Sequence, residues 1–371
     1  MPSLSLMCWI TMPSLYPAEK PTTLLDPLPD KNGHANAATA ELGRSTNAVE
    51  VPSEANISNG TLKLFDIAPD TTLKRKSVSI VSPLRYPGSK RRFASYVAEA
   101  LRINNFRPKL FVEPFAGGLR VALQMLADNL VDRVGIGELD PLVADFWHCV
   151  FFETEWLIES INALEVDLDT WHHYKSYNPV TAKERAIACI FLNRTNFSGI
   201  LNSAAGPIGG VNQTSIYKIG CRFTKATVIK RIRQAASYRD RIAFICNNGW
   251  QETITYTESL EYKPKDVFCY LDPPFYDKAS KLYRHYFEND DHGILRDALR
   301  RRPYKWLLSY DAADEIKALY SDKRMFRAQR GVELLYTLAR SKKHKPVKEI
   351  VVTNLPLLPL HDKVWRSTEQ W

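Results

Sequence analysis

Long hydrophobic runs are missing from this chain. Its 371 residues contain no stretch of about 18 consecutive apolar residues, the length that spans a bilayer. The apolar segment at 4–10 has no Lys or Arg before it and no clear small-residue cleavage site after it, so it does not have the pattern of a signal peptide. The sequence therefore predicts a cytoplasmic protein with no membrane partner.

Cysteine is scarce, and metal-binding spacings are missing. The chain contains no CxxC pair and no Cys/His cluster at zinc-ligand spacing. Its six cysteines lie far apart, at Cys8, Cys149, Cys189, Cys221, Cys246 and Cys269. We therefore expect reduced thiols and no structural metal.

Acidic residues are too few to balance the basic ones. The chain has 50 Lys and Arg against 41 Asp and Glu, which gives a net charge of +9. Residues 1–80 hold 7 basic and 8 acidic side chains, so the remainder carries +10. A basic globular region favours a polyanionic partner, and nucleic acid is the first candidate.

Regular structure is not indicated in residues 1–80. This segment holds 8 of the 22 prolines and long polar stretches, without a sustained period of 2 or 3.6 residues. Such a segment buries too little apolar surface to offset the entropy of ordering it. We expect a mostly disordered N-terminal extension without a catalytic role, part of which does not belong to the native protein if translation starts at Met7 or Met12.

From residue 84 onward the pattern is that of alternating helices and strands. Helices are expected over 89–101, 117–129 and 141–152, and strands over 109–114 and 133–140, which together resemble the start of a βαβ fold. Residues 153–240 read as helical, with a Gly/Ser/Asn-rich stretch at 202–215. Strand patterns return at 241–246, 266–275 and 304–310, with a hairpin-like pair at 333–340 and 349–354.

These elements predict an α/β protein with a doubly wound, Rossmann-like sheet and a helical insertion. We divide it into an extension at 1–80, a first catalytic part at 84–152, a helical insertion at 153–240 and a second catalytic part at 241–371.

The segment EPFAGG at 113–118 lies at the first strand-to-helix turn. Glycines there let a ligand approach the backbone and leave helix N–H groups free for polar or anionic atoms, although a tight turn alone would also explain them. The segment lacks the GxGxxG pattern, which disfavours a dinucleotide. Glu138 ends the second strand, where an acid accepts hydrogen bonds from ribose hydroxyls in doubly wound folds. The combination indicates an adenosine-containing ligand.

The segment LDPPF at 271–275 follows an apolar strand pattern. Consecutive prolines remove two N–H donors, so the turn offers hydrogen-bond acceptors without donors. Such a turn suits an amino group held by its hydrogens, with Phe275 as a stacking surface. A simple strand terminator is the alternative. Upstream, RYPGSKRR at 85–92 combines an aromatic residue, a Pro-Gly turn and cations, with a solvated turn as the alternative to a binding segment.

Taken together and in this order, RYPGSK, EPFAGG, GELD, LNRTNFSG and DPPF resemble the Dam-type family of DNA adenine-N6 methyltransferases across roughly 84–360. The resemblance implies S-adenosyl-L-methionine as cofactor. It implies that the cofactor is bound by Tyr86, Lys90, Glu113, Pro114, Phe115, Gly117, Gly118, Glu138 and Asp272. It also implies that the target adenine is held by Asp272, Pro273, Pro274 and Phe275.

Two positions depart from the family pattern. Leu119 and Arg120 stand where many members have a further small residue, and Phe275 replaces the commoner tyrosine. The phenylalanine preserves stacking and removes a hydroxyl.

The predicted reaction is direct methyl transfer to a flipped adenine. Asp272 and the Pro273 carbonyl would accept the two N6 hydrogens and direct the nitrogen lone pair at the methyl group. No cysteine follows a proline, so the Pro-Cys nucleophile of cytosine-C5 enzymes is missing. The same turn also fits cytosine N4 or an RNA adenine, and a catalytically inert DNA-binding module is the alternative from another class.

The DNA contacts are predicted from charge. Between 215 and 241 there are eight basic residues against one acid, Asp240. We expect DNA contacts from Asn193, Arg194, Arg222, Lys225, Lys230 and Arg231. The basic residues within 340–348 are a second candidate, although hairpin tips also carry lysines for solubility. We expect a monomer acting on double-stranded DNA, in a restriction-modification context that would add a cognate endonuclease as partner.

Overall fold

The computed structural model describes residues 8–10, 80–85, 91–276, 282–322, 328–334, 347–362 and 365–368. All of them belong to one compact unit, formed by residues 1–11 and 77–371.

A nine-stranded sheet in the order β1-β4-β3-β2-β5-β6-β8-β7-β9 forms the centre of this unit. The five central strands, β4 to β6 in that order, pair in parallel, whereas β1, β8 and β9 pair antiparallel to their neighbours. The strands are β1 (Cys8–Ile10), β2 (Leu110–Glu113), β3 (Arg133–Gly137), β4 (Ile242–Cys246), β5 (Val267–Leu271), β6 (Lys305–Asp311), β7 (Ala328–Leu334), β8 (Val347–Thr353) and β9 (Trp365–Ser367).

Helices cover both faces of the sheet. Side chains alternate along each central strand, so Phe111 packs with one hydrophobic cluster while Leu110 and Val112 pack with the other. The first cluster includes α1 (Arg91–Ile103), α2 (Arg120–Ala127) and α3 (Pro141–Phe152), and the second includes α8 (Trp250–Ser259), α10 (Asn289–Arg300) and α11 (Asp314–Leu319). The prediction of a doubly wound α/β sheet is confirmed.

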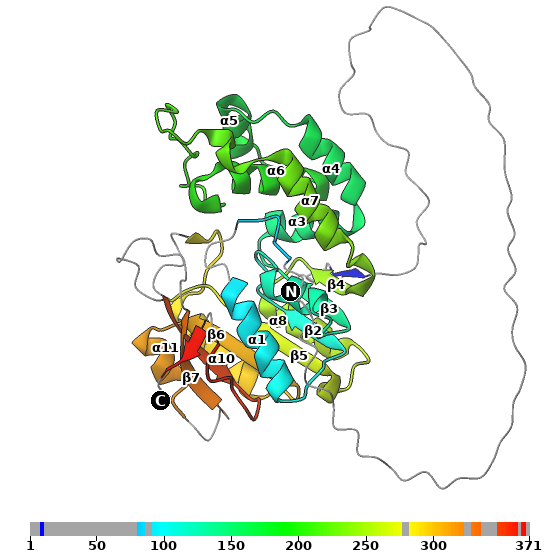
Figure 1. The fold of residues 1–371 in the computed structure, drawn as a ribbon, viewed down its shortest axis with the longest axis vertical. Coiled ribbons are helices and arrows are strands. Elements are labelled where there is room, and N and C mark those ends of the chain that lie inside the picture. Colours follow the sequence, from blue (N-terminus) through cyan, green and yellow to red (C-terminus); the bar gives the residue numbers. More distant parts are fainter. Residues whose placement is uncertain are drawn as a thin grey trace, which may run out of the picture. The chain divides into compact units, whose positions relative to one another are not determined.

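The helical insertion packs on α3 (Figure 1). Its helices are α4 (Thr154–Ala163), α5 (Leu168–Ser176), α6 (Ala182–Thr195) and α7 (Lys225–Ala236), with short 3₁₀ turns η1 (Phe197–Gly199), η2 (Ile219–Arg222) and η3 (Arg239–Arg241). A fourth turn, η4 (Pro264–Asp266), precedes β5. Helix α6 begins with a capping box between Thr181 and Glu184 and is buried along residues 186–195. It contacts α3, α4 and α5, so it forms the core of the insertion.

Several predicted elements needed correction. Helix α2 begins at Arg120 rather than 117, because Gly117 and Leu119 adopt positive φ in the turn before it. The strand expected over 133–140 ends at Gly137, and β7 begins at Ala328, earlier than expected. The pairing of β7 with β8 is antiparallel, as the predicted hairpin requires.

The N-terminal region and the thiols also differ from expectation. Residues 8–10 form β1 on the edge of β4, which no periodicity indicated, whereas the rest of 1–79 lies outside the described residues. Cys246 is disulfide-bonded, contrary to the expected reduced thiol, and the strand register places the backbone of Cys8 opposite it. Cys149, Cys189, Cys221 and Cys269 are free. None of the described helices is long and apolar enough to cross a membrane.

Candidate active site

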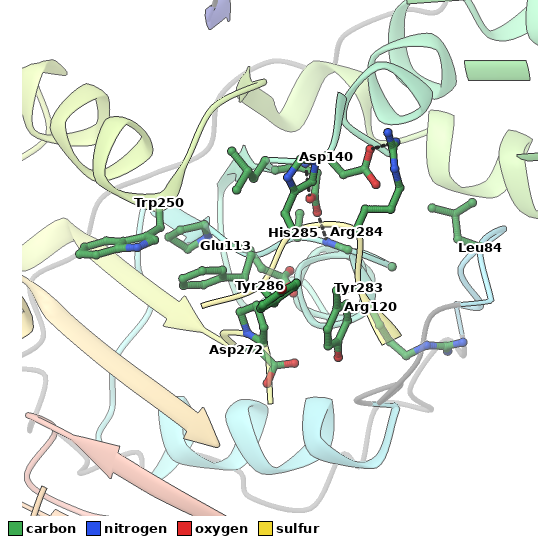
Figure 2. A pocket seen from close by; sticks show the side chains of 18 of the residues that line it. Leu84, Glu113, Arg120, Asp140, Trp250, Asp272, Tyr283, Arg284, His285 and Tyr286 are labelled. Carbon is green, nitrogen blue, oxygen red and sulfur yellow. Dashed lines mark hydrogen bonds and ion pairs between the residues drawn. The ribbon is translucent and has the colours of Figure 1, made fainter. Parts of the chain in front are cut away.

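A pocket opens where β2, β3 and β5 end. It contains about 1010 Å³ of empty space, including its open mouth. Figure 2 shows side chains from these strand ends converging with the segment 283–286. The pocket is lined by parts of three predicted motifs: Glu113, Pro114, Phe115, Gly117 and Gly118, then Glu138, then Asp272 and Pro274. The sheet topology thus brings together residues that are far apart in the sequence.

The turn after β2 is held by its own hydrogen bonds. The Gly117 N–H donates to Glu138 Oε2 at 2.7 Å, and Trp147 Nε1 donates to the Gly117 carbonyl at 2.8 Å. Gly117 has φ 43° and Leu119 has φ 49°, and the left-handed conformation is costly for a residue with a Cβ. The sequence suggested that N–H groups of this turn are free for a ligand. The Gly117 N–H instead donates to Glu138, because a buried carboxylate requires donors.

Glu138 is buried at the end of β3. Its carboxylate also accepts from the Asp140 N–H at 2.9 Å. Burial raises the pKa of Glu138 to about 7, and hydrogen bonds from the backbone limit the rise. A carboxylate has about four acceptor positions, so Glu138 retains acceptor capacity for a ligand hydroxyl.

Glu113 is the second buried acid of the pocket. Burial raises its pKa well above the ordinary value, and Asp272 and Glu138 raise it further, while the Ala122 N–H donates to it at 3.0 Å. Four acidic side chains thus line one pocket, and three of them, Glu113, Glu138 and Asp140, carry a raised pKa. Such a site favours a cationic ligand, because a positive charge would relieve the repulsion among the carboxylates.

The turn after β5 presents Asp272 to the pocket. Ser309 Oγ of β6 donates to Asp272 Oδ1 at 3.0 Å, and the Ser309 hydroxyl lies 2.9 Å from Tyr270 OH. Pro273 is buried and Pro274 lines the pocket. Phe275 is not among the lining residues and instead packs edge-on against Tyr283, with ring centroids 6.0 Å apart.

Residues 283–287 form a wall of the pocket that the sequence analysis missed. Arg284 Nη1 donates to Asp140 Oδ1 at 2.8 Å, and Phe287 packs edge-on against Phe115. Tyr283, His285 and Tyr286 complete this wall, and Trp250 lines the opposite side. The aromatic and basic run YRHYF shortly after DPPF is the signal that could have indicated it.

Two residues predicted to contact DNA make hydrogen bonds within the protein. The Asn193 side chain is fully buried, donates to the carbonyls of Arg85 and Gly199, and accepts from the Arg85 N–H. Arg194 is 5% exposed and donates to the Pro83 carbonyl. Both side chains therefore anchor the segment 80–85 on α6.

The other predicted DNA contacts lie around α7. Lys225 Nζ donates to the Asn162 carbonyl at 2.7 Å, and Lys230 is exposed. Arg222 and Arg231 line a second pocket. Tyr86 and Lys90, like most of the basic residues within 340–348, lie outside the described residues, so their predicted roles stay predictions. The predicted absence of a metal also stays a prediction.

Comparison with known proteins gives one family. The sequence model of the family described as "D12 class N6 adenine-specific DNA methyltransferase" matches residues 86–334. No curated protein matches the chain.

Proposed function

Because the chain belongs to the D12 class of N6 adenine-specific DNA methyltransferases, we propose that it methylates adenine at specific sites in double-stranded DNA. The methyl donor that such a methyltransferase requires is S-adenosyl-L-methionine, which we place in the pocket between β2, β3 and β5. When bound, this cofactor supplies a methyl group on a positively charged sulfur.

The residues present fit such a cofactor. Buried Glu138 has acceptor capacity for the ribose hydroxyls, as expected for the acid that ends the second strand. Glu113 and Asp272 provide a negative environment for the charged sulfur and the amino group. Phe115 and Trp250 line the same pocket and offer apolar surface for the adenine ring.

One observation supports the site of methyl transfer: Asp272 and Pro274 of the turn after β5 line the same pocket as Glu138 and the glycine turn. Asp272 and the Pro273 carbonyl accept the two hydrogens of the adenine amino group, so that the nitrogen lone pair faces the methyl group. Ser309 fixes the Asp272 carboxylate through its hydrogen bond. Positioning and exclusion of water carry the reaction, and no covalent intermediate with the protein is needed.

The target base leaves the duplex in this proposal. A base stacked inside DNA cannot reach a pocket at the edge of a sheet, so it must be flipped out. Phe275 and Tyr283, which contact each other beside the turn, supply aromatic surface near the flipped ring. On the insertion, the exposed apolar residues of the segment 197–217 are suited to entering a groove: Phe197, Val211, Ile216 and Tyr217.

Purified protein, duplex DNA and S-adenosyl-L-methionine with a labelled methyl group test the proposal. We expect label in DNA and, after digestion to nucleosides, N6-methyladenine. A product with methyl on cytosine N4, or methylation of RNA alone, would contradict the assigned substrate. Long-read sequencing of the methylated DNA then identifies the recognition sequence.

Asp272→Ala tests the proposed role of the Asp272 carboxylate. Because Asp272 holds the amine and not the duplex, we expect loss of methyl transfer with retained DNA binding.

A duplex carrying 2-aminopurine at the target should gain fluorescence on binding as the base unstacks, and an unchanged signal would argue against flipping. We further propose that one chain suffices, because one flipped base needs only one active centre, and that a cognate restriction endonuclease recognises the same sequence.

A further inference from the structure

Four arginines line a second pocket, beside the segment 80–85. It is formed by that segment, the end of α6, η2 and the start of α7. The lining residues are Arg85, Arg194, Cys221, Arg222, Thr224, Thr227, Val228 and Arg231. None of these residues is acidic, and two threonines add hydroxyl groups to the wall. We refer to this site as the arginine pocket.

Arg194 lies at the base of the arginine pocket. It is 5% exposed, and its guanidinium donates to the carbonyls of Pro83 and Arg222. Its Nε has no hydrogen-bond partner among the described residues. A buried N–H without an acceptor is costly, and an oxygen atom from a bound anion would satisfy it.

The four positive charges also act on one another. Burial lowers the pKa of Arg194 to about 9, with further lowering by Arg231 and Arg85. The pKa of Arg85 is lowered by burial and then by Arg222. Since no carboxylate lines the pocket, an anion bound there would relieve this repulsion.

The arginine pocket adjoins the proposed active site along the chain. Leu84 lines the active-site pocket, whereas the next residue, Arg85, lines the arginine pocket. Asn193 fixes Arg85 by accepting from its N–H and donating to its carbonyl, both at 2.7 Å. Adjacent residues of one fixed segment therefore line the two pockets.

We propose that the arginine pocket binds a phosphate of the DNA strand whose adenine enters the active-site pocket. This inference rests on the proposed function, because it requires duplex DNA as the substrate. Planar guanidinium groups match the geometry of phosphate oxygens, and four of them around one pocket suit a single phosphodiester.

Arg222→Gln and Arg231→Gln test this inference. Arg222 is exposed and Arg231 is partly buried, so neither variant removes a core side chain. With mixed-sequence duplex DNA, fluorescence anisotropy should show an affinity loss of about tenfold for each variant, because a charge-assisted phosphate contact is lost. The slope of log affinity against log salt concentration should fall by about 1.

Arg233→Gln is the control for charge. Arg233 lies on the same helix, α7, but its guanidinium pairs with Glu155 at 3.0 Å and does not line the arginine pocket. The variant loses the same net charge as the test variants. Because Arg233 does not line the pocket, we expect its affinity to stay within about twofold of the wild type. Circular dichroism of all variants checks that the fold is preserved.

The outcomes separate the two proposals. Unchanged affinity and salt slope in both test variants would overturn the phosphate contact, even if the wild type methylates DNA. If inorganic phosphate raises the melting temperature of the wild type but not of the variants, while their DNA affinity is unchanged, the pocket serves a free anion and the inference is wrong. If the test variants lose affinity and have a smaller salt slope, but the wild type transfers no methyl group, the phosphate contact would stand and the proposed function would be overturned.

Discussion

Glu138 combines a structural and a ligand-binding task in one carboxylate. It accepts from the backbone of Gly117 and Asp140, and it is the proposed acceptor for the ribose. Burial raises its pKa to about 7, so the group changes charge within the physiological pH range. Ribose hydroxyls bind the ionised carboxylate better than the neutral acid, because the ionised form is an acceptor at both oxygens.

Binding of the cofactor should therefore depend on pH. We expect the affinity for S-adenosylhomocysteine, which transfers no methyl group, to fall about tenfold per unit as the pH drops below about 7. Above that value the carboxylate is already ionised, so the affinity should level off. Isothermal titration calorimetry between about pH 5.5 and about pH 7.5 measures this dependence.

Glu138→Gln is the control for the pH effect. The amide does not titrate, so this variant should bind more weakly and without the same dependence. An equal dependence in both proteins would assign the titration to another group, such as Glu113 or Asp140, whose pKa values are also raised by burial.

Ser309 is a positioning residue in the proposed mechanism. Its hydroxyl donates to Asp272 at 3.0 Å and is close to Tyr270 OH. In Ser309→Ala the carboxylate loses this donor and its orientation, so we expect kcat to fall about tenfold while the KM for DNA is unchanged. Steady-state methyl transfer measures both constants. Ser309→Thr keeps the hydroxyl and should restore most of kcat; failure of this rescue, or a change in KM alone, would contradict the role.

Which residues line the pocket was partly readable from the sequence. Glycines, an acid and a double proline at strand ends are local signals, and the structure brings Gly117, Glu138 and Asp272 to one pocket. Ser309 and Trp250 have no local signal, because their positions depend on which strands become neighbours. Asn193 carried a misleading signal: its amide is suited to base edges, yet in the fold it binds the backbone of Arg85.

The turn η1, which follows helix α6, meets the segment 80–85 at Gly199. Gly199 has φ +75°, and a Cβ there would lie 2.4 Å from the Arg85 carbonyl oxygen. This close approach allows Asn193 to bind both backbones. The segment that carries Leu84 and Arg85 is thus held on the helical insertion by a contact that only glycine permits.

Gly199→Ala should displace this segment. We expect a loss of about 2–3 kcal/mol in the free energy of unfolding, from backbone strain and from lost hydrogen bonds. Gly210→Ala is matched to it, since Gly210 has φ +76° but open space at the Cβ position. The control should lose only about 1 kcal/mol, the strain contribution. Urea denaturation measures both, and equal losses would show that the contact with Arg85 adds no stability.

Most elements were predictable, whereas their order in the sheet was not. Periodicity places the central strands within a few residues, because each is a short apolar run bounded by turns. The position of β8 between β6 and β7 depends on packing across the whole sheet. Leu119 and Gly117 shorten α2 through their positive φ, which a helical pattern does not reveal.

The whole unit brings a basic insertion next to an acidic pocket. The remainder of the chain beyond residue 80 carries a net charge of +10, yet Glu113, Glu138 and Asp272 line the pocket. The basic surface attracts the DNA backbone, while the acidic pocket favours a cationic cofactor over the DNA phosphates. Among the described residues, the arginine pocket thus contains no acid, whereas the active-site pocket contains four acids beside Arg120 and Arg284.

Every described residue that lines the active-site pocket lies between Ser82 and Phe287, and the family match begins at residue 86. A chain reduced to Ser77–Trp371, the main part of the described unit, should therefore keep its methyl transfer activity. It loses β1, its three residue pairs with β4, and Cys8, whose backbone lies opposite the disulfide-bonded Cys246. We therefore expect a lower melting temperature but kcat/KM within about twofold of the full chain. Thermal unfolding and methyl transfer on the same duplex measure the two effects. A truncated protein that folds and binds S-adenosylhomocysteine but transfers no methyl group would assign residues 1–76 to the catalytic machinery, because the fold and the cofactor pocket would both be intact.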